Sequence, residues 1–159
     1  MPRSIEFAFL DSHVTARAVL LDDDAPRTCQ AVWDCLPVSG DALHAMYSGT
    51  VAALFLTDSR IGAEVGEENA TTNIQTGDVM FTHYDAGKRH GHPEALSEIY
   101  WAYDRYVWPT IPGQHIPAIA NVFARILDDA SAFYDMSRRT HSEGFKRLQI
   151  HRVEALVGS

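Results

Sequence analysis

Three histidines and two glutamates lie close together in the middle of the sequence, and their side chains are of the types that bind metal ions. His83, His90 and His92 are followed by Glu94 and Glu98. Imidazole and carboxylate groups are suitable ligands for zinc, iron, nickel or manganese. This segment is therefore the first place to look for a metal-dependent site.

The same segment also has the composition of an exposed loop. Residues 85–93 are rich in glycine, lysine, arginine and histidine, which is typical of a solvated connection. Spacing alone seldom fixes a coordination shell, because the ligands must also converge in space. We therefore favour no metal ion and no other cofactor. A metal-dependent enzyme that uses His83, His90, His92 and Glu98 remains the alternative hypothesis.

Glu98 lies in a stretch where hydrophobic residues dominate. Strict alternation over Leu96–Tyr103 puts Glu98 on the same face as Tyr100 and on the opposite face from Trp101. A carboxylate on an apolar face needs a partner or water, and its pKa would rise if the site were dry. His44 is the partner that we expect. The alternative, which the sequence leaves open, is a solvated Glu98 on an exposed face.

Further polar and aromatic residues are candidates for the wall of a ligand pocket. Tyr47 and Ser48 precede Gly49 and offer an aromatic ring and a hydroxyl, although both also suit packing and turn formation. His115 follows a Pro-Gly segment, and binding residues often lie on such loops. The candidate ligand-binding residues are His44, Tyr47, Ser48, Glu98, Tyr100, Tyr103 and His115.

The elements that must position these residues follow from hydrophobic periodicity. Alternating or short apolar runs predict strands over Ser4–Leu10, Thr15–Leu21, Asp41–Tyr47, Val51–Leu56, Val79–Tyr84, Leu96–Tyr103, Ile119–Leu127 and Phe145–Val153. Residues 57–76 are polar and punctuated by glycine, which predicts a loop with room for one short strand. The strands are mostly contiguous in sequence, which favours an antiparallel sheet over a doubly wound α/β fold.

Two helices complete the prediction. Pro26 suits the first turn of a helix, and Asp22–Asp24 place negative charge near the start of that helix. A second helix is expected from a cap at Asp128-Asp129 to about His141, with Gly144 as its stop. Together these elements predict a mainly β fold, a closed barrel of roughly eight strands with two helices, in a single domain spanning residues 1–159.

Charge and cysteine content limit the partners and the compartment. Thirteen Lys and Arg against 21 Asp and Glu give a net charge of -8, which argues against nucleic acid and anionic membrane surfaces as partners. No apolar run approaches the roughly 20 residues that span a bilayer. Cys29 and Cys35 both fall in the first predicted helix, too far apart along its axis to be bridged. We therefore expect free thiols and a cytoplasmic protein.

Several short motifs follow one another in the order in which a known fold carries them. Ala25-Pro26-Arg27-Thr28 resembles the Ala-Pro-x-Thr that opens the first helix of cyclophilins, and Asn121–Ile126 resembles a late strand of the same fold. His44–Gly49 and Gly77–Val79 resemble a smaller bacterial family that has a cyclophilin-like barrel and no assigned function. The resemblance extends over residues 4–153. It implies a closed, roughly eight-stranded barrel with helices over its open ends.

The resemblance does not extend to prolyl isomerase activity. Cyclophilins that are isomerases carry a Phe-His-Arg stretch followed by Gln-Gly-Gly-Asp, whereas residues 44–64 read HAMYSGTVAALFLTDSRIGAE and contain neither. We therefore expect no isomerase activity, and whether the protein is an enzyme stays open. Gly77-Asp78 together with His90 and His92 also resembles one metal-binding element of cupins, but a second histidine-bearing copy is missing from the sequence.

The leading hypothesis is a cyclophilin-like barrel that binds an unidentified small molecule in a pocket near its mouth. Polar groups set among aromatic rings are the usual lining of such pockets. Two alternatives remain: the metal-dependent enzyme with cupin-like chemistry, and a structural or interaction module in which exposed aromatic residues form the interface of a homo-oligomer.

Overall fold

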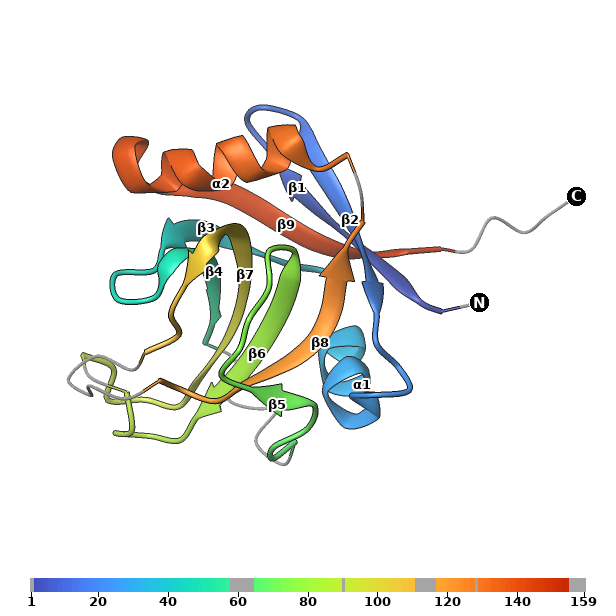
Figure 1. The fold of residues 1–159 in the computed structure, drawn as a ribbon, viewed down its shortest axis with the longest axis vertical. Coiled ribbons are helices and arrows are strands. Elements are labelled where there is room, and N and C mark those ends of the chain that lie inside the picture. Colours follow the sequence, from blue (N-terminus) through green and yellow to red (C-terminus); the bar gives the residue numbers. More distant parts are fainter. Residues whose placement is uncertain (1, 58–64, 90, 111–116, 128, 155–159) are drawn as a thin grey trace, which may run out of the picture.

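The computed structural model describes residues 2–57, 65–89, 91–110, 117–127 and 129–154. The elements, labelled in Figure 1, are β1 (Ser4–Phe9), β2 (Val14–Leu20), α1 (Pro26–Cys35), β3 (Val38–His44), β4 (Gly49–Leu56), β5 (Ala70–Thr71), β6 (Asp78–Tyr84), β7 (Leu96–Val107), β8 (Ala120–Ile126), α2 (Ser131–Glu143) and β9 (Lys146–Val153).

Eight of these strands form a closed antiparallel barrel. The strand order is β2-β1-β9-β3-β4-β7-β6-β8, and β2 pairs with β8 to close the ring. The two-residue strand β5 pairs with β8 beside the ring. The closed barrel predicted from the sequence is confirmed. Closure also removes the unpaired strand edges that would otherwise invite aggregation.

The observed elements agree with most of the predicted ranges, and the largest difference is in the third strand. It was expected at Asp41–Tyr47 but begins directly after Pro37, at Val38, and ends at His44. The reason is its pairing with β9, where Val38 lies opposite Ile150. Sequence periodicity near Gly40 is weak, whereas the ladder with β9 fixes the start of the strand.

The helix α2 covers one end of the barrel and contributes to the main hydrophobic core. It contacts β2, β3, β4 and β7, and Figure 1 shows it lying over the strands at that end. Phe133 of α2 packs with its ring centroid 5.5 Å from Phe7 and 5.7 Å from Trp101. The buried Trp101 indole donates a hydrogen bond of 2.9 Å to the hydroxyl of Ser137. Aromatic packing and this satisfied polar contact fix α2 on the barrel.

The N-terminus of α1 is capped by a distant residue, which corrects the expectation from sequence. Asp22 forms an ion pair with Arg3, and Ala25 is the N-cap without a side-chain bond. Instead, the carboxylate of Glu68 accepts hydrogen bonds from the backbone N–H of Arg27 at 3.1 Å and of Thr28 at 2.7 Å. A carboxylate at a helix N-terminus satisfies exposed donors and the helix dipole wherever in the chain it comes from.

The start of α2 differs from the prediction in the same way, whereas its end agrees. Ala130 is the N-cap and makes no side-chain hydrogen bond, so the helix does not begin with the expected aspartate cap; Asp128 lies outside the described residues. Gly144 follows the last turn with a φ of 89° and a ψ of -164°, a backbone conformation that is essentially restricted to glycine. The predicted stop at Gly144 is confirmed.

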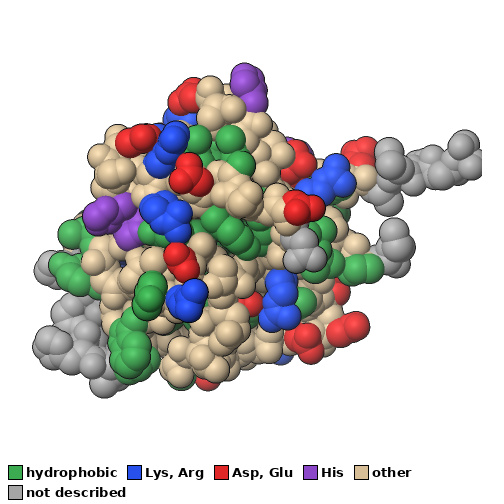
Figure 2. Space-filling model, turned by 45° about the horizontal axis from the view of Figure 1, so that its top comes forward, with side chains coloured by type: hydrophobic (Ala, Val, Ile, Leu, Met, Phe, Trp, Pro, Cys, Tyr) green, Lys and Arg blue, Asp and Glu red, His purple; other side chains and the backbone are tan. Residues whose placement is uncertain are grey.

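Cys29 and Cys35 are not bridged to each other, as expected, and Cys29 is fully buried. Figure 2 shows basic and acidic side chains interspersed on the face that carries α2. Within α2, Arg139 lies 3.3 Å from Asp135, and Arg138 of α2 lies 3.0 Å from Asp104 of β7. In the described part of the chain, neither helix has the length and apolar character needed to cross a bilayer.

Candidate functional site

Three neighbouring strands place Glu98 beside an aromatic ring and a hydroxyl. In β7, Glu98 lies opposite Phe55 of β4 and opposite Thr82 of β6. Residues paired across antiparallel strands share a face of the sheet. Tyr100 is two residues further along β7 and therefore lies on the same face, where its hydroxyl forms a hydrogen bond of 2.7 Å with Thr82.

This face is distinct from the one that carries the main core. Ile99 and Trp101 alternate with Glu98 and Tyr100 and belong to the large core cluster with α2. Tyr100 belongs to a smaller apolar cluster with residues such as Met80. The face of Glu98 is thus apolar and covered rather than solvated. The expectation of a carboxylate on an apolar face is met, and the alternative of a solvated Glu98 is wrong, because only 8% of the residue is exposed.

Burial changes the acidity of Glu98. It raises the pKa of the carboxyl to about 7, and the positive charge of Arg89 and a hydrogen bond from Tyr84 offset this only in part. Glu98 can therefore gain or lose its proton close to neutral pH. Burial raises the pKa of the Tyr84 hydroxyl well above its usual range, and the negative charge of Glu98 raises it further. The expected partner of Glu98 was His44, whereas the observed partners are Tyr84 and Arg89.

Arg89 reaches this face from the loop that joins β6 to β7. A short turn in that loop pairs Arg89 with His92, whose backbone N–H donates to the Arg89 carbonyl at 3.0 Å. The guanidinium carbon lies 4.9 Å from the ring centroid of Phe55 and 5.3 Å from that of Tyr84. The Nε atom of Arg89 is buried and has no hydrogen-bond partner among the described residues. Two aromatic rings therefore hold a cation close to Glu98.

The described histidines of the 83–92 segment do not converge. His83 lies opposite Ser97, on the other face of the sheet from Glu98, and its Nδ1 lies 2.9 Å from the Ser97 hydroxyl. His92 packs against the ring of Phe55, and His90 lies outside the described residues. Within the described ranges, no group of three His, Cys, Asp or Glu side chains is arranged to hold a metal ion.

His44 belongs to a different cluster, at the end of β3. Its Nε2 lies 2.6 Å from the hydroxyl of Tyr103, and its ring centroid is 4.7 Å from that of His141 in α2. Burial lowers the pKa of His44, and the proximity of His141 lowers it further. Through Ala52, the strand register puts His44 in one row with Trp101. His44 and Glu98 therefore point to opposite faces of the barrel wall.

Between these two clusters, a turn before β4 meets the segment after β7. The Ser48 hydroxyl accepts a hydrogen bond of 3.3 Å from the backbone N–H of Thr110, and the Thr110 hydroxyl donates to the carbonyl of Tyr47. Gly49 ends this turn with a φ of 74°, and a Cβ there would lie 1.9 Å from the carbonyl oxygen of Tyr106. Only glycine fits this close approach.

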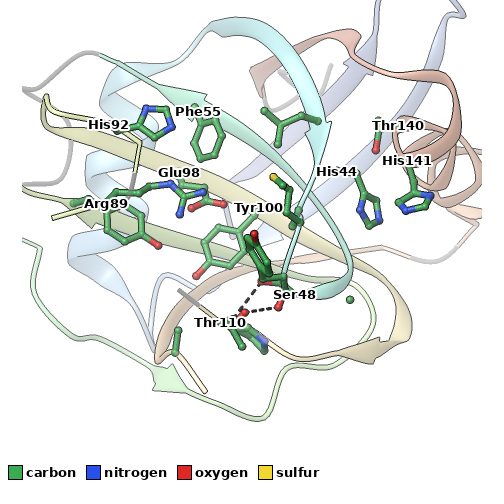
Figure 3. Close-up of a pocket in the computed structure, with 18 of the residues that line it drawn as sticks. His44, Ser48, Phe55, Arg89, His92, Glu98, Tyr100, Thr110, Thr140 and His141 are labelled. Atoms are coloured by element: carbon green, nitrogen blue, oxygen red, sulfur yellow. Dashed lines mark hydrogen bonds between the residues drawn. The ribbon is translucent and has the colours of Figure 1, made fainter. Parts of the chain in front are cut away.

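These groups line one pocket of about 990 Å³. Figure 3 shows its two polar ends, with Ser48 and Thr110 between them. We call one the Glu98 end, formed by Phe55, Tyr84, Arg89, His92, Glu98 and Tyr100. We call the other the His44 end, formed by His44, Thr140, His141 and Phe145.

Of the candidate residues from sequence, five line this pocket: His44, Tyr47, Ser48, Glu98 and Tyr100. Tyr103 does not line it, because alternation along β7 turns its ring into the core, where both its hydroxyl and its ring contact His44. His115 lies outside the described residues. Sequence reasoning missed Tyr84, Arg89 and Phe55. Arg89 carried no signal, since a single arginine in a polar loop reads as solvated.

Comparison with known families places the chain. A profile for a family described as protein of unknown function (DUF3830) matches residues 8–151. The chain belongs to this family. No curated protein matches the chain at a significant level.

Two solved structures resemble this DUF3830 protein. One is McbB, solved in complex with tryptophan, with a TM-score of 0.70 and 16% identity over 98% of this chain and 46% of McbB. This chain thus spans less than half the length of McbB. The other is the hypothetical protein AF2241 from Archaeoglobus fulgidus, with a TM-score of 0.56 and 18% identity over 96% of this chain and 95% of that one. At such identities the likeness establishes the fold alone.

Proposed function

We propose that the protein binds a small organic molecule in the pocket between the Glu98 end and the His44 end. The observation that carries the proposal is Glu98, a carboxyl group that is buried at the pocket wall and has a pKa raised to about 7. Ionisable groups held in such an unfavourable setting cluster at functional sites, because stability alone would favour an apolar residue there.

The lining of the pocket supports the same proposal. Aromatic rings from β4, β6 and β7 surround a few polar groups, and the volume of about 990 Å³ is at the upper end of the range for small-molecule sites. The exposed rings of Tyr47 and Phe145, at 56% and 71%, lie at the wall as well and offer apolar contact to a ligand. McbB, which has a similar fold over 46% of its length, has been solved in complex with tryptophan, so a compact organic molecule is a reasonable ligand class to test here.

A thermal-shift screen tests this proposal. Purified protein is heated with a metabolite library that includes L-tryptophan, and at least one compound should raise the melting temperature. At a concentration a hundred times the dissociation constant, linkage predicts a rise of roughly 5 to 10 °C.

The variant Glu98→Gln ties the shift to the pocket. It should markedly reduce the shift, measured relative to its own ligand-free melting temperature, because it removes the ionisable group. The exposed Glu94→Gln variant is the matched control and should keep the shift. A screen without a stabilising compound, or a shift unchanged in Glu98→Gln, would contradict the proposal.

A further inference from the structure

Two side chains of opposite charge lie at the Glu98 end of the pocket without forming an ion pair with each other. Arg89 and Glu98 both line the pocket, and each influences the other electrostatically. Yet between these two described residues no nitrogen and oxygen come within the 4.0 Å of an ion pair. Elsewhere in the described chain, arginines near a carboxylate do form ion pairs: Arg3 pairs with Asp22, and Arg125 pairs with Asp78 at 3.2 Å.

The aromatic rings explain why Arg89 stays available. Its guanidinium lies over the rings of Phe55 and Tyr84 and donates a hydrogen bond to the Tyr84 hydroxyl, and the edge that carries its Nε–H is left for a further acceptor. The Nε–H on that edge is buried without an acceptor among the described residues. A buried donor without a partner is unfavourable, because it has lost its hydrogen bonds to water and gained none in exchange. A carboxylate is the group that matches this edge with two parallel hydrogen bonds.

Glu98 has the complementary requirement. Its carboxylate is nearly buried, and apart from Arg89 its described polar contact is the Tyr84 hydroxyl. A cationic or multiply donating group would stabilise the ionised carboxylate. An acid alone would bring its negative charge up to Glu98, and an amine alone would leave the Arg89 edge without an acceptor. A ligand that carries both charges side by side satisfies both residues.

We propose that the Glu98 end binds an ammonium carboxylate zwitterion of the α-amino acid type, with the ligand carboxylate on Arg89 and the ligand ammonium on Glu98. This inference rests on the proposed function, since it names the ligand class of the same pocket. The ligand side chain extends along the pocket towards Tyr47 and Leu43, which are aromatic and apolar. Side chains of that character are therefore preferred.

The inference is tested with sets of three compounds that share a side chain and differ only in charge. One set is L-tryptophan, tryptamine and indole-3-propionate; the other is L-leucine, isoamylamine and 4-methylpentanoate. Binding is measured by calorimetry at pH 8, where Glu98 is mostly ionised. We expect the zwitterion of at least one set to bind ten times more tightly, or better, than either singly charged analogue.

Variants assign each charge to its residue. In Arg89→Gln, the amino acid should bind no more tightly than the corresponding amine. In Glu98→Gln, the amino acid should bind no more tightly than the corresponding acid. Arg89→Lys keeps the positive charge but cannot form bidentate hydrogen bonds to a carboxylate. In this variant the amino acid should still bind more tightly than the amine, by a smaller factor than in the natural protein. The exposed Arg105→Gln and Glu94→Gln variants are controls and should leave all affinities unchanged.

The outcomes separate this inference from the function it rests on. If a singly charged analogue binds as tightly as the amino acid, or if both variants weaken all three compounds alike, the zwitterion assignment is overturned while small-molecule binding stands. If neither set binds but another metabolite, one that is not an amino acid, gives a thermal shift that depends on Glu98, the zwitterion assignment is again overturned while small-molecule binding stands. If nothing binds, both proposals fail. The comparison of analogues uses the natural sequence and does not depend on any variant folding.

Discussion

The two ends of the pocket contain similar side chains but differ in how these are paired. At the His44 end, the imidazole and the Tyr103 hydroxyl satisfy each other at 2.6 Å, and His141 packs against the same imidazole. At the Glu98 end, a buried acid and a cation lie near each other without forming an ion pair. Polar groups paired internally fix a structure, whereas groups held apart keep their bonding capacity for a ligand.

The largest test of this contrast is the stability of Glu98→Gln as a function of pH. The folded-state pKa of Glu98 is about 7, against an ordinary value of 4.5, so the folded protein binds the extra proton between these values. Stability of the natural protein should therefore fall as pH rises through this window and level off above it. The difference of about 2.5 pKa units corresponds to on the order of 3 kcal/mol.

The glutamine variant lacks this ionisation. It should be more stable than the natural protein by up to about 3 kcal/mol at pH 8, by about 1 kcal/mol at pH 5, and nearly equal to it at about pH 4. Urea denaturation at several pH values measures the difference, and Glu94→Gln, at an exposed position, should follow the natural protein throughout. Parallel pH curves for Glu98→Gln and the natural protein would mean that the carboxyl is not held under strain.

The next effect concerns the pairing at the His44 end. Tyr103→Phe removes the hydroxyl that meets His44 while keeping the buried ring, so the free energy of unfolding should fall by about 1 kcal/mol. Tyr106→Phe, at a residue that is 72% exposed, is the matched control and should change stability little. An unchanged unfolding midpoint in Tyr103→Phe would show that this end is not held by its hydrogen bond.

The smallest effect concerns the two imidazoles. His141→Gln removes a charge that lowers the pKa of His44, so this pKa should rise, although burial, the larger cause, still holds it down. The contribution of His44 to stability is opposite in sign to that of Glu98: it should decrease as pH falls below about 6.5, because the unfolded state then binds a proton that the folded state resists. The variant should lose less over this range.

NMR titration of the His44 ring resonances measures this pKa directly. The variant His13→Asn, at an exposed turn residue, is the control and should leave the titration of His44 unchanged. A titration midpoint of His44 that stays the same in His141→Gln would show that the two rings do not interact electrostatically.

Much of the fold could be predicted because it depends on local periodicity. Alternation identified the strands that became β1, β2, β4 and β6–β9, and Pro26, which suits the first turn of a helix, marked the start of α1. The helix caps could not be predicted from local sequence. The cap of α1 is Glu68, which is 40 residues further along the chain than Thr28, from whose backbone N–H it accepts a hydrogen bond. Local charge at Asp22 suggested a cap, but a partner distant in sequence, Arg3, holds it instead.

For the candidate site, too, local features could be predicted from the sequence, whereas contacts between residues distant in sequence could not. By itself, the sequence determined that Glu98 shares an apolar face with Tyr100, because side chains in a strand alternate with a period of two whatever surrounds them. Only the tertiary structure decided which groups meet Glu98. The register of β3, β4 and β7 turns His44 to the face of Trp101, and the turn at Arg89 carries a cation from a polar loop onto Phe55. Partners across a barrel depend on strand register and loop geometry, which are set by the packing of the whole chain.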